Sequence, residues 1–329
     1  MGWKMVGKMN PGSAILLPVR DYHLAATLDS GQVFRWQRIE NSWHGVVGRQ
    51  WVHLTQTPEG IRAGTATPVE NWDWLRRFLQ TEMDLAAILN TFPDDDPMRQ
   101  AVAACRGLRL LRQDPWECLA SFILSSTKQI VQIRQIVAHL CKNYGEPCPG
   151  ATLTSLCGTG APSPAETTIA NLVHHAFPTP QRIATLSEAE LRACKMGFRA
   201  PSLLAAARQI ADGSLDLERI RQLDHAAARA ELMRLRGVGG KIADCVLLFA
   251  YGFDTAFPVD VWVERALQEL YFPRRRASEQ RLRTFAATYF GPHAGYAQQY
   301  LFHYMRTRKN PPRASHSATA LTTSRRTRR

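Results

Sequence analysis

Long apolar runs are absent from this 329-residue chain, since no eighteen consecutive residues are apolar. We therefore expect no membrane-spanning helix, and the first residues lack the apolar core of a secretory signal. Cysteine is sparse and scattered, with an odd total of seven. Such a set favours reduced thiols in a cytosolic protein over a disulfide framework.

Acidic residues are missing from the end of the chain. The net charge is +13, from 41 basic and 28 acidic residues. Eight basic residues lie from Arg306 onward, where Asp and Glu do not occur, so the rest of the chain carries 33 basic against 28 acidic residues, or +5. Basic charge favours a nucleic-acid partner, although much of it belongs to this end. Aromatic residues are also absent from Thr307 on, so we expect residues 307–329 to form a basic disordered tail.

Two regions of different composition precede that tail. Up to about residue 65, alternating stretches at 33–39 and 51–55 predict strands of an antiparallel sheet. After residue 106 the patterns are helical only. We therefore expect an α+β fold, with an N-terminal antiparallel sheet domain in residues 1–106 and a mostly α-helical domain in residues 107–306.

Capping signals predict helix boundaries. A helix is expected to start at Thr67-Pro68 and another after Asp114, because a cap residue followed by proline is typical of helix N-termini. The last helix is expected over residues 297–305, ahead of the tail.

The most informative stretch is Leu235-Arg-Gly-Val-Gly-Gly-Lys-Ile-Ala-Asp-Cys245, which predicts two helices joined by a hairpin. Gly237 and Gly239 interrupt the helical pattern, and a Gly-x-Gly turn leaves backbone N–H groups uncovered. At the start of the next helix, such N–H groups form a site suited to a DNA phosphate. That helix is expected to begin near Lys241 and to end about Gly252.

Asp260 follows Lys241 by nineteen residues and can cap a further helix. The helix between them is about 15 Å long, and a connector of about nine residues spans up to ~30 Å. The chain can therefore return to the same end, which would bring an amine and a carboxylate together at two helix N-termini. Cys245 lies one turn after Lys241 and shares its face.

This pattern resembles the helix-hairpin-helix glycosylase superfamily, whose motif is a Gly-x-Gly hairpin, a lysine and a later aspartate. The wording Gly-Gly-Lys-Ile-Ala-Asp-Cys, followed by Phe257-Pro-Val-Asp-Val-Trp262, is similar to the 8-oxoguanine DNA glycosylase/lyase family. Other segments in family order, among them Ser30–Trp36, Leu110–Cys118 and Gly295–Phe302, extend the resemblance over residues 14–306. It implies a helix-hairpin-helix glycosylase domain and an enzyme that removes 8-oxoguanine from duplex DNA and nicks the strand.

The resemblance also assigns roles to side chains. Lys241 would attack the sugar and form a Schiff base, after which β-elimination nicks the strand, and Asp260 would aid the amine and offset the developing positive charge. Phe302 and Cys245 would lie against the two faces of the extruded base, and Gln298 would read its Watson–Crick edge. On spacing alone, a core ring, a small buried thiol and a surface amide would be the favoured interpretations of these three.

Gly31 would discriminate the lesion in this interpretation. A backbone carbonyl accepts a hydrogen bond from the N7–H of 8-oxoguanine but opposes the N7 lone pair of guanine, and glycine lets the backbone come close. The alternative is an ordinary turn glycine. The Pro258 carbonyl is likewise expected at the base. Phe249, eight residues after Lys241, could line the pocket or belong to the core.

DNA contacts are expected from the hairpin and from Phe198-Arg199. Gly237 and Gly239 would hold a phosphate without reading sequence. Arg199 would touch the orphaned partner base, and Phe198 would wedge into the stack. A surface arginine is the alternative for Arg199.

The chain departs from the eukaryotic branch of the family around these contacts. Thr127-Lys128-Gln129 replaces a run of asparagines, and Gln132 stands where an arginine is usual. Phe198 replaces a tyrosine, and Trp262 replaces a histidine. Because these positions surround the partner base and the phosphates, they put opposite-base recognition in doubt, while the chemistry is unaffected.

The resemblance also implies the partners and the location. We expect a monomer that binds damaged double-stranded DNA, needs no cofactor or metal and acts in the cytoplasm at the nucleoid, or in the nucleus if it is eukaryotic. Cys141 and Cys148 are spaced like the first pair of an iron–sulfur cluster in related glycosylases, but no cysteine follows Asp260, so no cluster is expected. Two alternatives are an alkyl-purine glycosylase without a nucleophilic lysine and a non-catalytic DNA-binding module. Lys241 together with Asp260 disfavours both.

Overall fold

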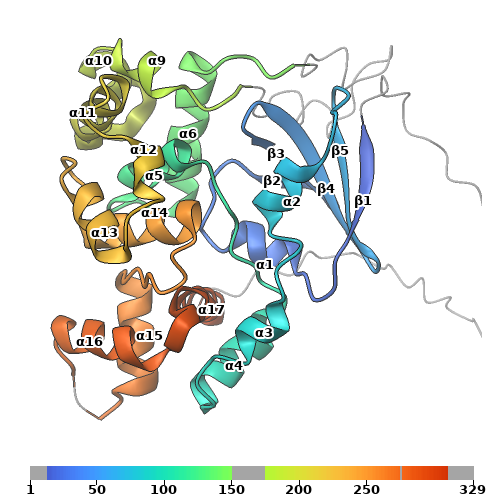
Figure 1. The fold of residues 1–329 in the computed structure, drawn as a ribbon, viewed down its shortest axis with the longest axis vertical. Helices are drawn as coiled ribbons and strands as arrows, with labels where there is room; N and C mark the ends of the chain where they lie inside the picture. Colours follow the sequence, from blue (N-terminus) through green and yellow to red (C-terminus); the bar gives the residue numbers. More distant parts are fainter. Residues whose placement is uncertain (1–12, 150–174, 275, 310–329) are drawn as a thin grey trace, which may run out of the picture.

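The computed structural model describes residues 13–149, 175–274 and 276–309, divided between a sheet and a group of helices (Figure 1). The sheet is antiparallel and five-stranded, in the order β1-β5-β4-β3-β2. Its strands are β1 (Ala14–Pro18), β2 (Gln37–Ile39), β3 (Ser42–Val47), β4 (Gln50–Thr57) and β5 (Gly60–Thr65). The expected α+β fold with an N-terminal antiparallel sheet is therefore confirmed.

One face of the sheet is buried. β3 and β4 pair Trp43 with Leu54, and residues directly opposite each other point to the same face. Both side chains are buried in a cluster that also contains Leu75 and Phe78 of α2 (Asp73–Leu79). This short helix therefore closes the core of the sheet.

The helix expected at Thr67-Pro68 begins only at Asp73, so that prediction was wrong. The chain is irregular here because it is bound to the edge of the sheet. The backbone N–H of Val69 donates to the hydroxyl of Ser13 at 3.0 Å. A helix cannot begin until this edge contact has ended.

The strand expected over residues 33–39 is formed only at its end, in β2. Residues 33–36 instead join two cores. The ring of Phe34 packs edge-on against Phe122 of the helical part at a centroid distance of 5.6 Å, whereas Trp36 stacks on Phe78 beside the sheet at 5.9 Å. Because Val33, Phe34, Arg35 and Trp36 are all buried, the segment lacks the alternation of a strand with one solvated face.

The rest of the described chain is mainly helical. The helices are α1 (Leu24–Asp29), α3 (Leu85–Leu89), α4 (Asp96–Cys105), α5 (Pro115–Ser125), α6 (Ile130–Tyr144), α9 (Pro180–Ala184), α10 (Glu188–Leu191), η1 (Arg192–Met196), η2 (Gly197–Arg199), α11 (Ala200–Ala211), α12 (Leu217–Ile220), α13 (His225–Met233), α14 (Gly240–Val246), η3 (Leu247–Tyr251), α15 (Val261–Tyr271), α16 (Glu279–Tyr289), η4 (Gly291–His293) and α17 (Ala294–Lys309). The helix expected after Asp114 is confirmed, since the Asp114 carboxylate caps it by accepting from the N–H of Glu117 at 2.8 Å. Within the described ranges, no helix combines the length and apolar character needed to cross a bilayer.

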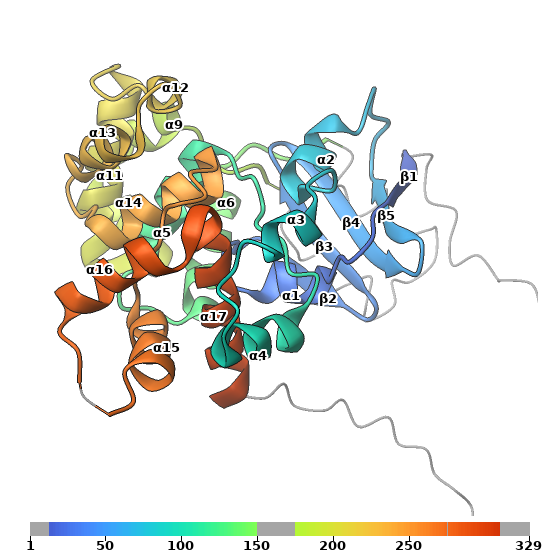
Figure 2. The same cartoon turned by 60° about the horizontal axis from the view of Figure 1, so that its bottom comes forward.

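The last helix is longer at both ends than residues 297–305. Its first part is fixed by Tyr296 and Tyr300, which are both fully buried, and the Tyr300 hydroxyl donates to the carbonyl of Leu108 at 3.0 Å. Its last turns include Arg306 and also residues 307–309, so the prediction that a disordered tail begins at Thr307 was wrong for these three residues. In two views α17 lies between α15 and α1 (Figures 1 and 2). The remainder of the predicted tail lies outside the described residues.

A buried glutamine holds the turn that follows α1. Gln32 donates through Nε2 to the carbonyl of Arg109 at 2.8 Å and accepts through Oε1 from the N–H of Leu111 at 2.8 Å. Gln299 of α17 donates to the carbonyl of Ser30 at 3.0 Å. The Ser30-Gly31 turn is thus fixed against both the connecting segment and α17.

Replacing Gln32 by methionine keeps the side-chain volume but removes these hydrogen bonds. We expect the free energy of unfolding to fall by about 2 kcal/mol or more, because buried backbone groups of Arg109 and Leu111 lose their partner. Urea unfolding measures the change. Gln222→Met is the control at an exposed position, and an equal, small effect of both substitutions would contradict the assigned role.

Candidate functional site

The hairpin between α13 and α14 depends on two glycines in different ways. Gly237 has φ +79°, and a Cβ there would lie 2.6 Å from the hydroxyl of Ser202, so no other residue fits without strain. Gly239 has an ordinary φ of −94° as the N-cap of α14, and a Cβ there would meet nothing within 4 Å. The backbone at Gly239 is therefore open to an approaching group from outside.

The start of α14 is tightly built. A Cβ at Gly240 would collide with the guanidinium of Arg229, which forms an ion pair with Asp244 at 2.7 Å. Asp244 is buried, and burial raises the pKa of its carboxyl group although the Arg229 partner opposes this shift. The pair locks α13 against α14 and so fixes the direction in which the next residue, Lys241, leaves the helix.

Lys241 and Asp260 come together as the spacing predicts. The Lys241 amine lies 5.7 Å from the ring centroid of Phe122. Asp260 caps α15, accepting through Oδ1 from the N–H groups of Trp262 at 3.0 Å and Val263 at 2.9 Å. Burial raises the pKa of Asp260, while these hydrogen bonds and the charge of Lys241 lower it. Both side chains are described, and they form no ion pair within 4.0 Å of each other. The amine and the carboxylate therefore interact electrostatically without a direct ion pair.

Cys245 completes this group one helical turn after Lys241. Burial raises the pKa of its thiol to about 12, while the charge of Lys241 lowers it and that of Asp260 raises it. The side chain is therefore a neutral thiol at physiological pH. It offers a small, polarisable surface beside the amine and no competing nucleophile.

Gly31 lies opposite Phe302. Its φ is +82°, and a Cβ there would lie 2.8 Å from Cδ1 of Ile130, 3.3 Å from Nη1 of Arg306 and 3.4 Å from Cε1 of Phe302. The turn after α1 thus reaches α17 and the start of α6 at one point. Only glycine allows the backbone to approach this closely with this φ.

Gln298 precedes Phe302 by one turn of α17 and shares its face. It is only 4% exposed, and its Oε1 has no hydrogen-bond partner among the described residues. A buried amide oxygen without a partner costs free energy in the folded protein. A ligand group that donates to this oxygen would remove that cost.

Arg306 was not among the site residues predicted from the sequence, but it follows Phe302 by one further turn. Its guanidinium lies 5.6 Å from the centroid of the Phe302 ring and donates through Nη2 to the carbonyl of Asp29. The Asp29 carboxylate pairs with Arg134 at 3.0 Å. The spacing of four from Phe302 was the available signal, but ending the helix at residue 305 hid it.

Pro258 and Phe249 are both buried. The Phe249 ring stacks on Phe122 at a centroid distance of 5.6 Å and an interplanar angle of 16°. Phe122 in turn lies under the Lys241 amine. Phe249 therefore belongs to the core and supports the aromatic surface on which the lysine rests.

A second cluster surrounds the loop between α5 and α6. Arg199 is only 3% exposed; it donates to the carbonyl of Ser126 and to the hydroxyl of Thr127, and lies 4.2 Å from the ring centroid of Phe198. Phe198 is 63% exposed. The exposed Gln132 accepts through Oε1 from the N–H of Gln129 at 3.2 Å, so it is part of the cap of α6. That capping role was not anticipated.

Trp262 lies apart from this cluster, in the first turn of α15. Its backbone N–H is bound to Asp260, and its ring lies 5.2 Å from the guanidinium of Arg265. The half-buried ring is accessible at the N-terminus of the helix. It brings a cation and an aromatic surface close to the capped carboxylate.

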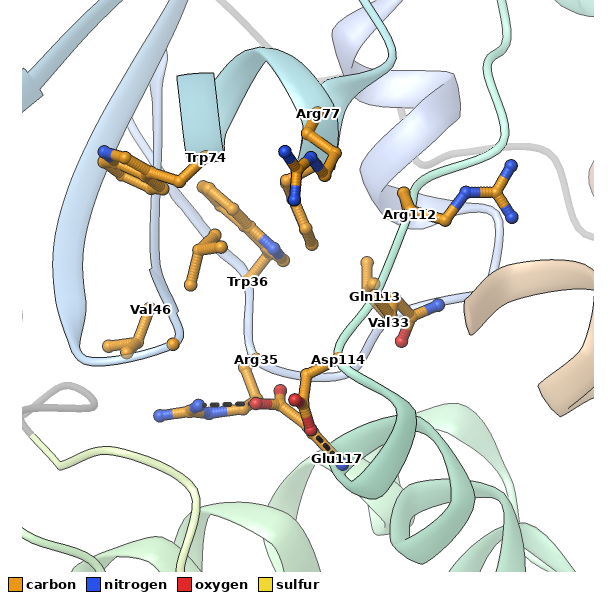
Figure 3. A pocket seen from close by; sticks show the side chains of 13 residues that line it. Val33, Arg35, Trp36, Val46, Trp74, Arg77, Arg112, Gln113, Asp114 and Glu117 are labelled. Atoms are coloured by element: carbon orange, nitrogen blue, oxygen red, sulfur yellow. Dashed lines mark hydrogen bonds and ion pairs between the residues drawn. The ribbon is translucent and has the colours of Figure 1, made fainter. Parts of the chain in front are cut away.

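A separate hollow lies between the sheet and α5 (Figure 3). Arg35 and Glu117 point toward each other there and pair at 3.0 Å, and Arg35 also donates to the carbonyl of His175. This ion pair joins the segment before β2 to α5. Among the described residues, no group of three or more His, Cys, Asp or Glu side chains could hold a metal ion.

Comparisons with known proteins give consistent matches. Residues 14–119 match the family model of the 8-oxoguanine DNA glycosylase N-terminal domain, and residues 120–291 match the HhH-GPD superfamily base excision DNA repair protein. The chain is 30% identical to a probable N-glycosylase/DNA lyase of Methanothermobacter thermautotrophicus, over 88% of this chain and 95% of that protein.

Solved structures agree in fold. The structure of MBOgg1 in complex with a low-affinity DNA ligand has a TM-score of 0.80 at 29% identity, covering 91% of this chain and 98% of that one. The Clostridium acetobutylicum 8-oxoguanine glycosylase/lyase, in complex with double-stranded DNA containing cytosine opposite 8-oxoguanine, has a TM-score of 0.77 at 29% identity. That match covers 90% of this chain and 98% of the other.

Asp260→Asn tests the electrostatics of the cap. Burial raises the pKa of Asp260, so the folded protein holds this proton more tightly than the unfolded chain. The charged carboxylate therefore reduces stability as pH rises from the ordinary value of 3.8 through the folded pKa. Since asparagine also caps helices, we expect the variant to be at least as stable as the wild type at pH 8, by up to about 1 kcal/mol.

Urea unfolding between pH 4 and pH 8 measures this difference, which should shrink as the pH falls. Asp224→Asn is the control, because Asp224 caps α13 from an exposed position. A loss well above 1 kcal/mol at pH 8 for Asp260→Asn alone would show that the folded protein stabilises the charge.

Proposed function

Because this chain belongs to the family of 8-oxoguanine DNA N-glycosylases/DNA lyases of the HhH-GPD superfamily, it is a base excision repair enzyme that removes the damaged base and cuts the strand, and we propose that both steps proceed through a Schiff base on Lys241. The observation that carries this proposal is the placement of the Lys241 amine next to the capped Asp260 carboxylate and the neutral Cys245 thiol.

The reaction begins with attack of the Lys241 nitrogen on C1′ of the damaged nucleotide. The C1′–N9 bond breaks, and its electron pair leaves with the base. Opening of the sugar ring gives an imine between Lys241 and C1′, and β-elimination then breaks the bond from C3′ to the phosphate oxygen. Asp260 stabilises the positive charge that develops at the sugar, and the fixed cap holds its carboxylate in place while charge builds up.

The base lies between two surfaces and is read at its edges. The Phe302 ring covers one face and the Cys245 thiol the other. Gln298 reads the Watson–Crick edge, which supplies a partner for its buried amide. The carbonyl of Gly31 accepts from N7–H, which 8-oxoguanine has and guanine lacks, and the Pro258 carbonyl lies at the same base.

DNA is held by groups around this pocket. Gly237 and Gly239 present backbone N–H groups to a phosphate, and the open space at Gly239 supports this contact. Phe198 enters the gap left by the extruded base, and Arg199 meets the partner base. Trp262 lies against the backbone beside the capped carboxylate.

The partner is damaged double-stranded DNA, and the enzyme acts where the chromosome is, at the nucleoid or in the nucleus. The finer proposal is that it acts as a monomer without an iron–sulfur cluster. The positions of the cysteines support the second point, because Cys245 lies in the pocket and none follows Asp260. The basic end would add non-specific affinity for DNA.

Lys241→Gln tests the nucleophile. We expect borohydride to trap the wild-type enzyme covalently on a duplex that contains one 8-oxoguanine, and trapping by Lys241→Gln to disappear while lesion binding remains. The reason is that an amide cannot form an imine with the sugar. Lys142→Gln removes an exposed lysine of α6 and should trap normally. Undiminished trapping by Lys241→Gln would refute the assignment.

The opposite-base preference depends on the second cluster. Strict family members are expected to hold cytosine with fixed donors, worth ~1–3 kcal/mol per base discriminated. Gln132 is uncharged and its oxygen is already used in a helix cap, so it penalises a wrong partner less than a guanidinium does. We therefore expect measurable excision opposite adenine, guanine or thymine.

Single-turnover excision from the four duplexes measures this preference. Gln132→Arg should sharpen it toward cytosine, whereas Gln132→Met, which loses the same cap without adding a guanidinium, should not. A cytosine preference on the order of a hundredfold or more over every other partner would rule out the idea.

A further inference from the structure

Arg306 is a charged side chain at the base pocket for which the mechanism above has no use. Its Nη1 atom lies 3.3 Å from the position of a Cβ on Gly31, and its guanidinium lies 5.6 Å from the Phe302 ring centroid. Any base that covers Phe302 and directs its N7 edge to Gly31 therefore lies beside this guanidinium. The placement comes from the helix, since Arg306 follows Phe302 by one turn of α17.

The guanidinium is held in place with most of its donors unused. Of its five N–H groups, one on Nη2 is bound within the described residues, to the carbonyl of Asp29. That bond leaves Nη1 facing the space between Gly31 and Phe302. A half-buried arginine with unused donors favours a ligand that brings oxygen acceptors or negative charge.

The surrounding charges leave this arginine incompletely neutralised. The Asp29 carboxylate is paired with Arg134 at 3.0 Å and meets Arg306 only through its backbone carbonyl. Arg134 therefore opposes the charge of Arg306, and Asp260 contributes a weaker attraction than Asp29. Neighbouring His303 adds no compensating charge, because burial lowers its pKa to about 4 and an imidazole is never negative. Two guanidinium groups thus share one nearby carboxylate.

We propose that the Arg306 guanidinium contacts the extruded base and stabilises the negative charge that appears on it as the C1′–N9 bond breaks. The inference rests on the proposed function, in which the electron pair of that bond leaves with the purine. In 8-oxoguanine this charge is shared between N9 and the oxygen on C8, which is bonded next to N7. The amine loses one proton and the purine anion gains one, so no other reactant is needed.

The two activities of the enzyme separate this role from a structural one. Release of 8-oxoguanine requires departure of a base, whereas cleavage at a pre-formed abasic site does not. Arg306→Met keeps the aliphatic length and removes the charge. With enzyme in excess over DNA, we expect its single-turnover base release to fall by about 100-fold, as for loss of one transition-state donor, and its cleavage of the abasic duplex to stay near wild type.

Arg306→Lys should recover part of the base release, because it restores a positive charge. The matched control is Lys142→Met, which removes an exposed cation from α6, away from the pocket and the basic end, and should leave both activities unchanged. An equal loss of both activities in Arg306→Met would show damage to the fold of α17 and overturn the proposal. Unchanged or faster base release would overturn it as well, because the guanidinium would then merely fill the pocket.

A failure of the Arg306 role and a failure of the proposed function give different results. If the wild-type protein released no 8-oxoguanine from any duplex, the proposed function would fail. If it released the base and Arg306→Met did so equally fast, only the role of Arg306 would fail.

Discussion

The Asp260 carboxylate is held by backbone N–H groups rather than by another side chain. Two N–H groups of α15 fix one of its oxygens, so its position relative to Lys241 follows from where α14 and α15 begin. A direct ion pair would hold the amine on the carboxylate and keep it from a sugar. The cap avoids this, because the helix N-terminus supplies the partners that burial would otherwise deny to the carboxylate. The helix start that holds the carboxylate therefore also sets where it lies relative to the amine.

The sheet contributes to the site through one turn. None of the strands carries a residue of the pocket, and the contribution is the backbone of Ser30-Gly31, fixed by Gln32 and Gln299. A backbone acceptor cannot change rotamer, so its direction is as rigid as the segments that hold it. The sheet, α2 and the connecting residues 109–113 therefore form a support for a single carbonyl group.

The sequence predicted those parts of the site that local signals encode. The hairpin, the start of α14 and the cap of α15 follow from glycine, lysine and aspartate at fixed spacing, and the structure has all three. Arg306 was missed because its contacts are with a turn more than 270 residues away. In the sequence it was also counted as the first residue of the basic end. The capping role of Gln132 was missed for a different reason. The side chain of a glutamine at this position could bind several groups, and only the fold of the α5–α6 loop determines which one it binds.

The short segment at residues 33–36 has a consequence for the modular character of the chain. Because Phe34 belongs to the helical core and Trp36 to the core of the sheet, no cut between the two family-model regions leaves both cores closed. A fragment that ended after the sheet would expose the Phe34 ring, and a fragment that began after the sheet would leave Phe122 without the ring that covers it. Although two family models match the two regions, this packing joins them, so a recombination that exchanged the sheet alone would have to exchange its neighbours too.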